Sequence, residues 1–239
     1  MEGDRNSRWF HLQANGRRKN NRIDAICVSD GNWCFDELLI KRHATEYFAS
    51  LFEEEVMVRP GLVCNISFPN LMEVHERVCS REVDEVEIKD TLFSMGALKS
   101  PGPDGFNPLF FQYQWETVRD SVVHFVKQVF LHPERVREVN GTLIVLIPKK
   151  EHPESFRDLR PISLCNVIYK LITKVVANRM KCFMAHVISP NQCSFVPGRL
   201  SSDNIIVAQE VIHSMRVMGG KKGYMAIKID LEKAYDRVN

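Results

Sequence analysis

The stretch Tyr224-Met225-Ala226-Ile227-Lys228-Ile229-Asp230-Leu231-Glu232-Lys233-Ala234-Tyr235-Asp236 decides how the rest of the sequence is interpreted. Apolar side chains on alternate positions from Met225 to Ile229 predict a short strand that ends at Asp230. A carboxylate fixed at a strand end can hold Mg²⁺, a hard cation that prefers oxygen ligands and keeps phosphate oxygens in its shell. Alternatively, Asp230 only caps the next turn, as Asp commonly does.

Length and composition permit one large domain or two small ones. The chain has 239 residues and 44% hydrophobic content, which suffices for a real core. The net charge is only +2, so any field that attracts nucleic acid must come from local patches. No apolar run approaches the length that spans a membrane.

The cysteines indicate a protein from a reducing compartment. They are scattered, number seven and contain no Cys-x-x-Cys pair. This usage predicts free thiols in an intracellular protein and argues against a zinc site or a disulfide scaffold.

Residues 1–22 are polar and basic. Arg17, Arg18 and Lys19 follow the aromatic residues Trp9 and Phe10. Basic residues with interleaved aromatics suit single-stranded nucleic acid, through phosphate contacts and base stacking. The alternative is a flexible, solvated terminus.

Apolar residues at helical spacing predict several amphipathic helices. The predicted ranges are 36–55, 84–99, 115–131, 166–187 and a last helix that Ser202 or Asp203 caps. In the 36–55 helix the predicted apolar stripe includes Leu38 and Leu39. The last helix is expected to bury Ile205, Val211, Ile212 and Met215. On the 166–187 helix, four basic residues are expected to point mostly outward: Lys170, Lys174, Arg179 and Lys181.

Two further strands are predicted. Residues 23–28, followed by a turn, suggest half of a small hairpin. Residues 142–147 form a continuous apolar, β-branched run, which predicts a buried strand. It opens into Lys149, and Arg160 follows after a polar loop. Cations where a buried strand emerges can bind a triphosphate; equally, lysines there can protect the strand from aggregation.

The stretch Pro101-Gly102-Pro103-Asp104-Gly105 predicts a rigid, sharp turn. Proline sets φ, and glycine admits positive φ.

Four stretches, in this order, resemble the opening blocks of a reverse transcriptase of LINE-type non-LTR retrotransposons, in particular the plant branch. They are Pro101 to Gly105, Leu146 to Lys149 with Arg160 to Leu164, Gln192 to Arg199, and Asp230 to Asp236. The N-terminal part resembles the segment between endonuclease and polymerase in the same elements. The resemblance therefore implies two domains, a basic and helical extension (residues 1–83) and the N-terminal part of a reverse transcriptase domain (residues 84–239).

The resemblance also implies roles for individual residues. Asp230 matches the first catalytic, metal-binding aspartate, with the Leu231 carbonyl as a second ligand. Lys149 and Arg160 match residues that hold the triphosphate of the incoming nucleotide. Tyr235 matches an aromatic gate whose ring would clash with a 2′-hydroxyl.

Further implications concern nucleic acid and location. Gly198 and Arg199 match a loop near the template strand, and the basic cluster from Arg17 to Lys19 adds a candidate contact. The implied cofactor is Mg²⁺, and the implied partners are an RNA template, a DNA primer and deoxynucleotides, with no membrane. Nuclear residence follows from the way of life of the family.

The expected fold class is α+β and helix-rich: the fingers and the start of the palm of a right-hand polymerase, after a helical extension. The second metal-binding block of the family, an aromatic-Ala-Asp-Asp turn, does not occur in the sequence. Since two-metal phosphoryl transfer needs further carboxylates, we expect a truncated chain that is inactive alone. Alternatives are a non-catalytic remnant that binds RNA or DNA, and a fragment without a stable fold.

Overall fold

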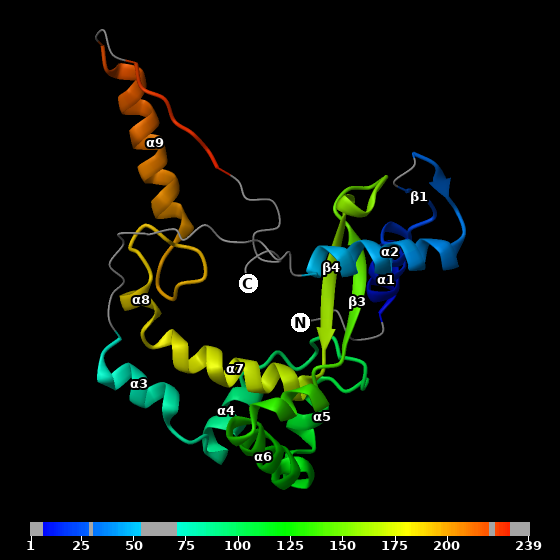
Figure 1. The fold of residues 1–239 in the computed structure, drawn as a ribbon, viewed down its shortest axis with the longest axis vertical. Helices are drawn as coiled ribbons and strands as arrows, with labels where there is room; N and C mark the ends of the chain where they lie inside the picture. Colours follow the sequence, from blue (N-terminus) through cyan, green and yellow to red (C-terminus); the bar gives the residue numbers. More distant parts are fainter. Residues whose placement is uncertain (1–6, 29–30, 54–70, 220–222, 230–239) are drawn as a thin grey trace. The chain divides into compact units, whose positions relative to one another are not determined.

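The computed structural model describes residues 7–28, 31–53, 71–219 and 223–229, and in them it shows helices and two two-stranded sheets (Figure 1). Contacts divide the chain into two compact units. Unit 1 comprises residues 1–59, 142–164 and 231–239, and unit 2 comprises 60–141 and 165–230. Many helices with few short strands confirm the predicted helix-rich α+β class. The predicted domain boundary after residue 83 stays a prediction.

Unit 1 contains two small sheets and helices that flank them. Its elements are α1 (Arg8–Asn20), β1 (Ile26–Cys27), β2 (Trp33–Cys34), α2 (Glu37–Phe52), β3 (Thr142–Pro148), the 3₁₀ helix η2 (Phe156–Asp158) and β4 (Leu159–Cys165). Strands β1 and β2 are antiparallel, with Ile26 opposite Cys34, which confirms the predicted hairpin. Helix α1 has no buried residue.

Helix α2 begins where the sequence predicts, but it buries a different stripe. The Asp36 carboxylate accepts hydrogen bonds from the Leu38 and Leu39 N–H groups, at 2.8 and 3.0 Å. The prediction that these two leucines join the apolar stripe is wrong, because 76% of Leu38 and 42% of Leu39 are exposed. The buried residues are Ile40, Ala44 and Phe48, which recur every four positions and therefore share one helical face.

Strand β3 confirms the predicted strand but not its burial. Leu143, Ile144 and Val145 are 51, 49 and 42% exposed, and Leu146 alone of the strand packs against the small core of unit 1. A two-stranded ribbon covers few of its own side chains, and in the described residues β3 pairs only with β4. The sequence did not predict β4, because Arg160 and Pro161 interrupt the apolar pattern there.

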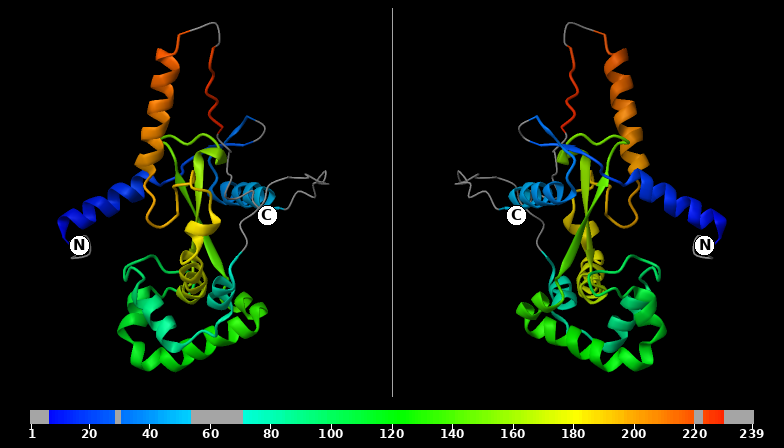
Figure 2. Two further views of the ribbon diagram at one scale, coloured as in Figure 1. Left: turned by 90° about the vertical axis from the view of Figure 1, so that its left-hand side faces the viewer. Right: turned by 90° about the vertical axis from the view of Figure 1, so that its right-hand side faces the viewer.

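Unit 2 is helical. Its elements are α3 (Glu73–Ser80), α4 (Glu85–Phe93), α5 (Pro108–Tyr113), α6 (Trp115–Leu131), the 3₁₀ helix η1 (Pro133–Glu138), α7 (Val167–Lys181), α8 (Met184–Val187) and α9 (Ser201–Val217). Figure 2 gives two further views of the ribbon. Helices α4, α6 and α7 supply most of one hydrophobic core, including Leu92, Val126, Leu171 and Val175.

The predicted helices of unit 2 agree in part with the structure. Helix α6 has the predicted bounds. Helix α4 is capped by Asp84 and ends at Phe93, short of residue 99, while Ile88, Leu92 and Met95 are buried as predicted. Helix α7 ends at Lys181, and α8 follows as a separate short helix.

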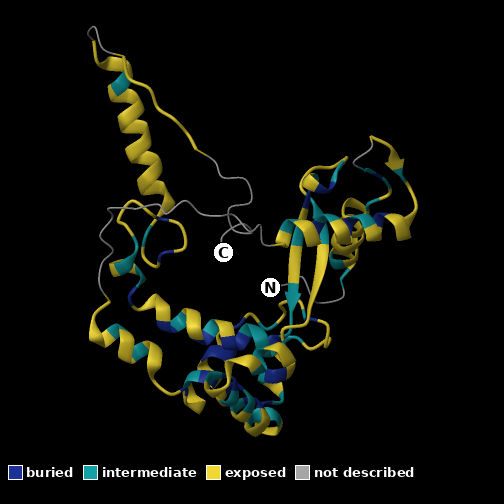
Figure 3. Ribbon diagram, in the orientation of Figure 1, coloured by how far each residue is buried: buried dark blue, intermediate teal, exposed yellow. Residues whose placement is uncertain are grey.

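The last predicted helix and strand differ from the structure. Ile205, Val211 and Ile212 of α9 are 57, 52 and 46% exposed, and Figure 3 shows almost all of α9 as exposed. No side chain caps this helix, so the prediction of a cap by Ser202 or Asp203 is wrong. Residues 223–229 form no strand. A strand is defined by hydrogen bonds to a neighbour, and the described residues supply none for this segment.

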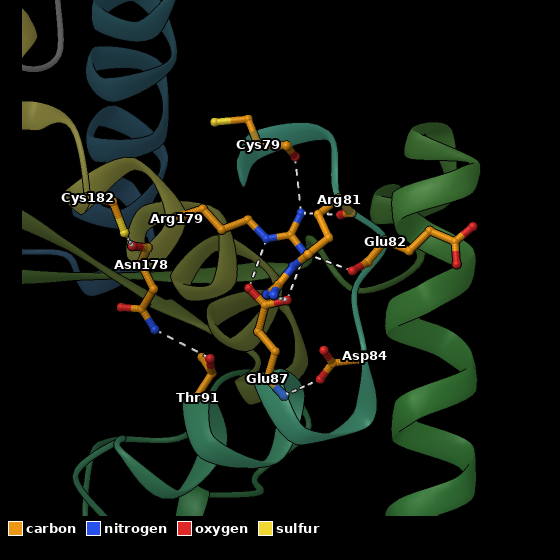
Figure 4. Close-up of polar contacts among 9 residues, drawn as sticks. All are labelled: Cys79, Arg81, Glu82, Asp84, Glu87, Thr91, Asn178, Arg179 and Cys182. Carbon is orange, nitrogen blue, oxygen red and sulfur yellow. Dashed lines mark hydrogen bonds and ion pairs between the residues drawn. The ribbon is translucent and has the colours of Figure 1, made fainter. Parts of the chain in front are cut away.

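Arg179 is the clearest correction to the predicted outward side chains of α7. It is only 5% exposed. Its guanidinium donates to both carboxylate oxygens of Glu87, at 2.8 and 2.7 Å (Figure 4). It also donates to the backbone carbonyls of Cys79, Arg81 and Glu82, at 3.1, 2.6 and 3.3 Å.

These acceptors match the buried positive charge of Arg179. The hydrogen bond from Arg179 is the main cause that holds the pKa of Glu87 below its usual value. A buried arginine is tolerated only when its donors and its charge are matched. The side chain therefore links α7 to the end of α3, to the segment that follows it and to the first turns of α4.

We predict that Arg179→Ala destabilises the protein by about 3 kcal/mol, because it removes two hydrogen bonds from the largely buried Glu87 carboxylate and leaves it with Arg81, at 3.2 Å, as its ion-pair partner. Urea unfolding, followed by circular dichroism, measures this loss. Arg77→Ala is the control, because it removes an arginine from the exposed pair with Glu73, at 3.3 Å, and should hardly move the midpoint. Equal midpoints for the two variants would contradict the prediction.

Candidate nucleotide and nucleic-acid site

The predicted site residues fall in three groups. Asp230, Leu231 and Tyr235 lie outside the described residues. Lys149 and Arg160 belong to unit 1, as do Arg17, Arg18 and Lys19. The turn from Pro101 to Gly105, and the loop with Gly198 and Arg199, belong to unit 2.

The hairpin of β3 and β4 brings Lys149 and Arg160 to the same end. The Lys149 N–H donates to the Asp158 carbonyl at 2.7 Å, so the end of β3 meets the start of β4. The Lys149 ammonium donates to the Arg157 carbonyl at 2.7 Å. The Arg160 side chain is exposed and has no hydrogen bond or ion pair within the described ranges. Its charge is therefore available to an anion.

Asp158 shapes the loop that joins the two strands. Its carboxylate accepts hydrogen bonds from the N–H groups of Glu154 and Ser155, at 3.0 and 3.1 Å, and pairs with Lys150 at 3.2 Å. The Glu154 N–H is the largest cause that lowers the pKa of Asp158 to about 2. The sequence carries a signal for this loop that the predictions above did not include, because Ser155 and Asp158 have the spacing of a capping box.

An open groove of about 960 Å³ lies beside this loop. Its lining includes Lys19 at the end of α1, Trp33 of β2, and Lys149 and Lys150. Trp33 is 51% exposed. Helix α1 ends in Arg17, Arg18 and Lys19, where positive charge is favourable to the helix dipole. Unit 1 therefore combines an exposed aromatic ring and several cations along one groove.

The Arg199 side chain binds the backbone of its own loop. Its guanidinium donates to the carbonyls of Ser189 and Gln192, and to those of Ala185 and Ile188. Gly198 before it has φ +78°, in the left-handed region that favours glycine. The pair therefore holds the shape of the loop between α8 and α9, and the template contact of either residue stays a prediction.

The turn from Pro101 to Gly105 packs against the start of α7. Asn166 accepts the Asp104 N–H on its side-chain oxygen at 3.3 Å, and Gly105 has φ +76°. Gly102 is buried, and a Cβ there would collide with the backbone of Cys165 and Asn166. Glycine is thus required where the turn crosses the junction of β4 and α7.

Comparison with known proteins identifies the C-terminal region. Residues 147–239 match the family model described as "Reverse transcriptase (RNA-dependent DNA polymerase)". Over these residues the chain is similar to reverse transcriptases. The match contains Lys149 and Arg160 as well as Asp230, and it confirms the family predicted from the sequence.

Similarity to relatives extends beyond this region. The chain is 31% identical over 239 residues to the "Transposon TX1 uncharacterized 149 kDa protein" of Xenopus laevis, across 99% of this chain and 18% of the relative. It is 27% identical over 157 residues to the "Retrovirus-related Pol polyprotein from type-1 retrotransposable element R2" of Bradysia coprophila, across 65% of this chain and 17% of the relative. These matches agree with the predicted LINE-type, non-LTR origin. The chain spans less than a fifth of the length of either relative.

Reverse transcriptases generally use a divalent metal ion, a nucleic-acid template and primer, and deoxynucleotides. Among the residues that the structure describes, no cluster of three or more His, Cys, Asp or Glu side chains could hold a metal ion. Likewise, no described helix is both long and apolar enough to cross a membrane.

We predict that the Asp158 loop contributes acid-dependent stability. The pKa of Asp158 is lower in the folded protein than its ordinary 3.8, so its stabilisation is present above pH of about 4 and is lost as the pH falls toward 2. Asp158→Asn should therefore lower the free energy of unfolding at pH 6, and the difference from the original protein should shrink toward pH 2. Urea unfolding at both pH values measures this, and a difference that does not change with pH would contradict it.

We predict that Gly102→Ala destabilises unit 2, because the new methyl group meets backbone atoms that cannot rotate away. Gly141→Ala is the matched control, since a Cβ at Gly141 meets no atom within 4 Å. Thermal unfolding should show a lower midpoint for Gly102→Ala alone. A shared midpoint for the two variants would show that the turn can move away from α7.

Proposed function

We propose that residues 147–239 bind an incoming deoxynucleotide and contribute to RNA-directed DNA synthesis on a DNA primer. The observation that carries the proposal is the reverse transcriptase match over residues 147–239, which includes both cations at the end of the β3–β4 hairpin. Arg160 supplies a planar guanidinium, without an ion pair among the described residues, that suits the oxygens of a triphosphate.

Lys149 has two roles in this proposal. Its ammonium group has three donors, and the bond to the Arg157 carbonyl uses one of them. The other donors and the charge can act on a phosphate, while the carbonyl holds the side chain at the loop. Fixed cations of this kind stabilise negative charge that develops on a phosphoryl group.

Asp230, Leu231 and Tyr235 complete the proposed site. A carboxylate from Asp230 and the carbonyl of Leu231 are hard oxygen donors that suit Mg²⁺. The bound ion would neutralise phosphate charge during transfer. The Tyr235 ring would lie beneath the sugar and exclude a 2′-hydroxyl, so Tyr235→Ala should admit ribonucleotides more readily.

We predict that Arg160→Gln weakens binding of a fluorescent deoxynucleotide in the presence of Mg²⁺ by about 10-fold or more, because it removes charge-assisted hydrogen bonds to the triphosphate. Fluorescence titration measures the dissociation constant. Arg42→Gln is the control, since Arg42 is an exposed arginine on α2 of the same unit. The proposal fails if the two substitutions have the same effect.

A second candidate function is nucleic-acid binding without catalysis. The observation in its favour is α1, a helix without a buried residue, with Arg17, Arg18 and Lys19 in its last turn. Phosphate contacts by these residues would make RNA binding strongly salt-dependent. Binding that survives Asp230→Asn, but weakens when Arg17 and Arg18 are neutralised, would favour this function if deoxynucleotide binding is absent.

A further inference from the structure

A row of lysines on unit 2 is used by neither proposed function. We call it the lysine stripe, and it comprises Lys99, Lys170, Lys174 and Lys181. The last three recur along α7 at intervals of four and seven residues, so they lie on one helical face. The buried face of α7, with Val167, Leu171 and Val175, is a different one.

Contacts with the backbone fix part of this stripe. The Lys170 ammonium donates to the Ser100 carbonyl at 2.8 Å, and the Lys174 ammonium donates to the Ser94 carbonyl at 3.0 Å. The Lys99 side chain lies against Gly96, where an added Cβ would be 3.4 Å from its Cγ. The segment after α4 therefore gathers lysines from two parts of the chain.

The charges of the stripe repel one another. Burial first, and then the charges of Lys99 and Lys181, lower the pKa of Lys174. Among the described residues, none of the four lysines forms an ion pair. An ammonium group with one hydrogen bond keeps two further donors, so the stripe has both charge and donors for an anion.

We propose that the lysine stripe binds the phosphodiester backbone of a single nucleic-acid strand without reading its bases. From Lys170 to Lys181, α7 rises by roughly 16 Å at 1.5 Å per residue. A row of this length can face a few successive phosphates of one extended strand. A row of charges over this length suits a ligand whose negative charges repeat, and lysines bind phosphates as point charges without base information.

The inference rests on the proposed function only in the kind of partner, since reverse transcription requires a nucleic-acid strand. It adds a contact surface on unit 2 that the nucleotide site in unit 1 does not include. Salt dependence tests it directly, because each lost phosphate contact lowers the slope of log affinity against log salt.

The experiment measures the anisotropy of a fluorescein-labelled RNA of about 12 uridines, longer than the stripe requires. The whole chain is compared with the double variant Lys99→Gln, Lys181→Gln. Both side chains are exposed, and neither ammonium group makes a hydrogen bond within the described ranges. Loss of two phosphate contacts should lower the slope by about 1.4 and the affinity roughly 10- to 30-fold at about 0.1 M salt.

The matched control is Lys89→Gln, Lys127→Gln, which removes the same charge from exposed positions of α4 and α6. It should leave the slope unchanged. Equal slopes for the two double variants would overturn the proposal, as would an unchanged pKa of Lys174 by NMR when the chain is saturated with RNA. Arg160→Gln should leave this slope in place, so failure of the nucleotide site and failure of the stripe are distinguishable.

Discussion

The buried pair of Arg179 and Glu87 is the interaction on which unit 2 most depends. An arginine in an apolar core is costly unless every donor is matched, and here the match comes from one carboxylate and three carbonyls. Because these acceptors belong to residues 79–87, the arginine can be buried only when that segment lies against α7. The interaction thus specifies how α4 and α7 meet, and their apolar side chains then fill the core.

The outer face of α7 follows from the same packing. Once Arg179 and the apolar residues face inward, Lys170, Lys174 and Lys181 lie along one side of the helix, next to the buried face. The carbonyls after α4 then anchor two of these lysines. A structural requirement for the core therefore leaves a row of positive charge at the surface, which is the basis of the proposed strand contact.

Unit 1 depends on a different constraint. Asp158 binds the backbone of its own loop, and this closes the β3–β4 hairpin and sets Lys149 and Arg160 at one end. Lys149 is tied to a carbonyl, whereas Arg160 has no partner among the described residues. The two cations differ accordingly: Arg160 gives the cleaner test of triphosphate binding, and Lys149 also supports the loop.

Features that depend on a few neighbouring residues could be predicted from the sequence, whereas features that depend on a partner far away in the sequence could not. The period of α6, the start of α2 after Asp36 and the β1–β2 hairpin could be predicted from the sequence, since each depends on a few neighbouring residues. The burial of Arg179 was not, because an arginine on a helix is indistinguishable from an exposed one until its acceptors are known. Strand β4 was missed because pairing with β3 overrides Pro161. The predicted burial of Ile205 and the predicted strand after Tyr224 required neighbours that the described residues do not supply.

The central claim is that Arg160 binds the triphosphate of a deoxynucleotide, and NMR of the chain labelled with ¹⁵N-arginine tests it most directly. Titration with dGTP and Mg²⁺ should shift the Arg160 side-chain resonance, assigned through Arg160→Gln, and should leave that of Arg42 in place. An Arg160 resonance that does not move at saturating nucleotide would contradict the account.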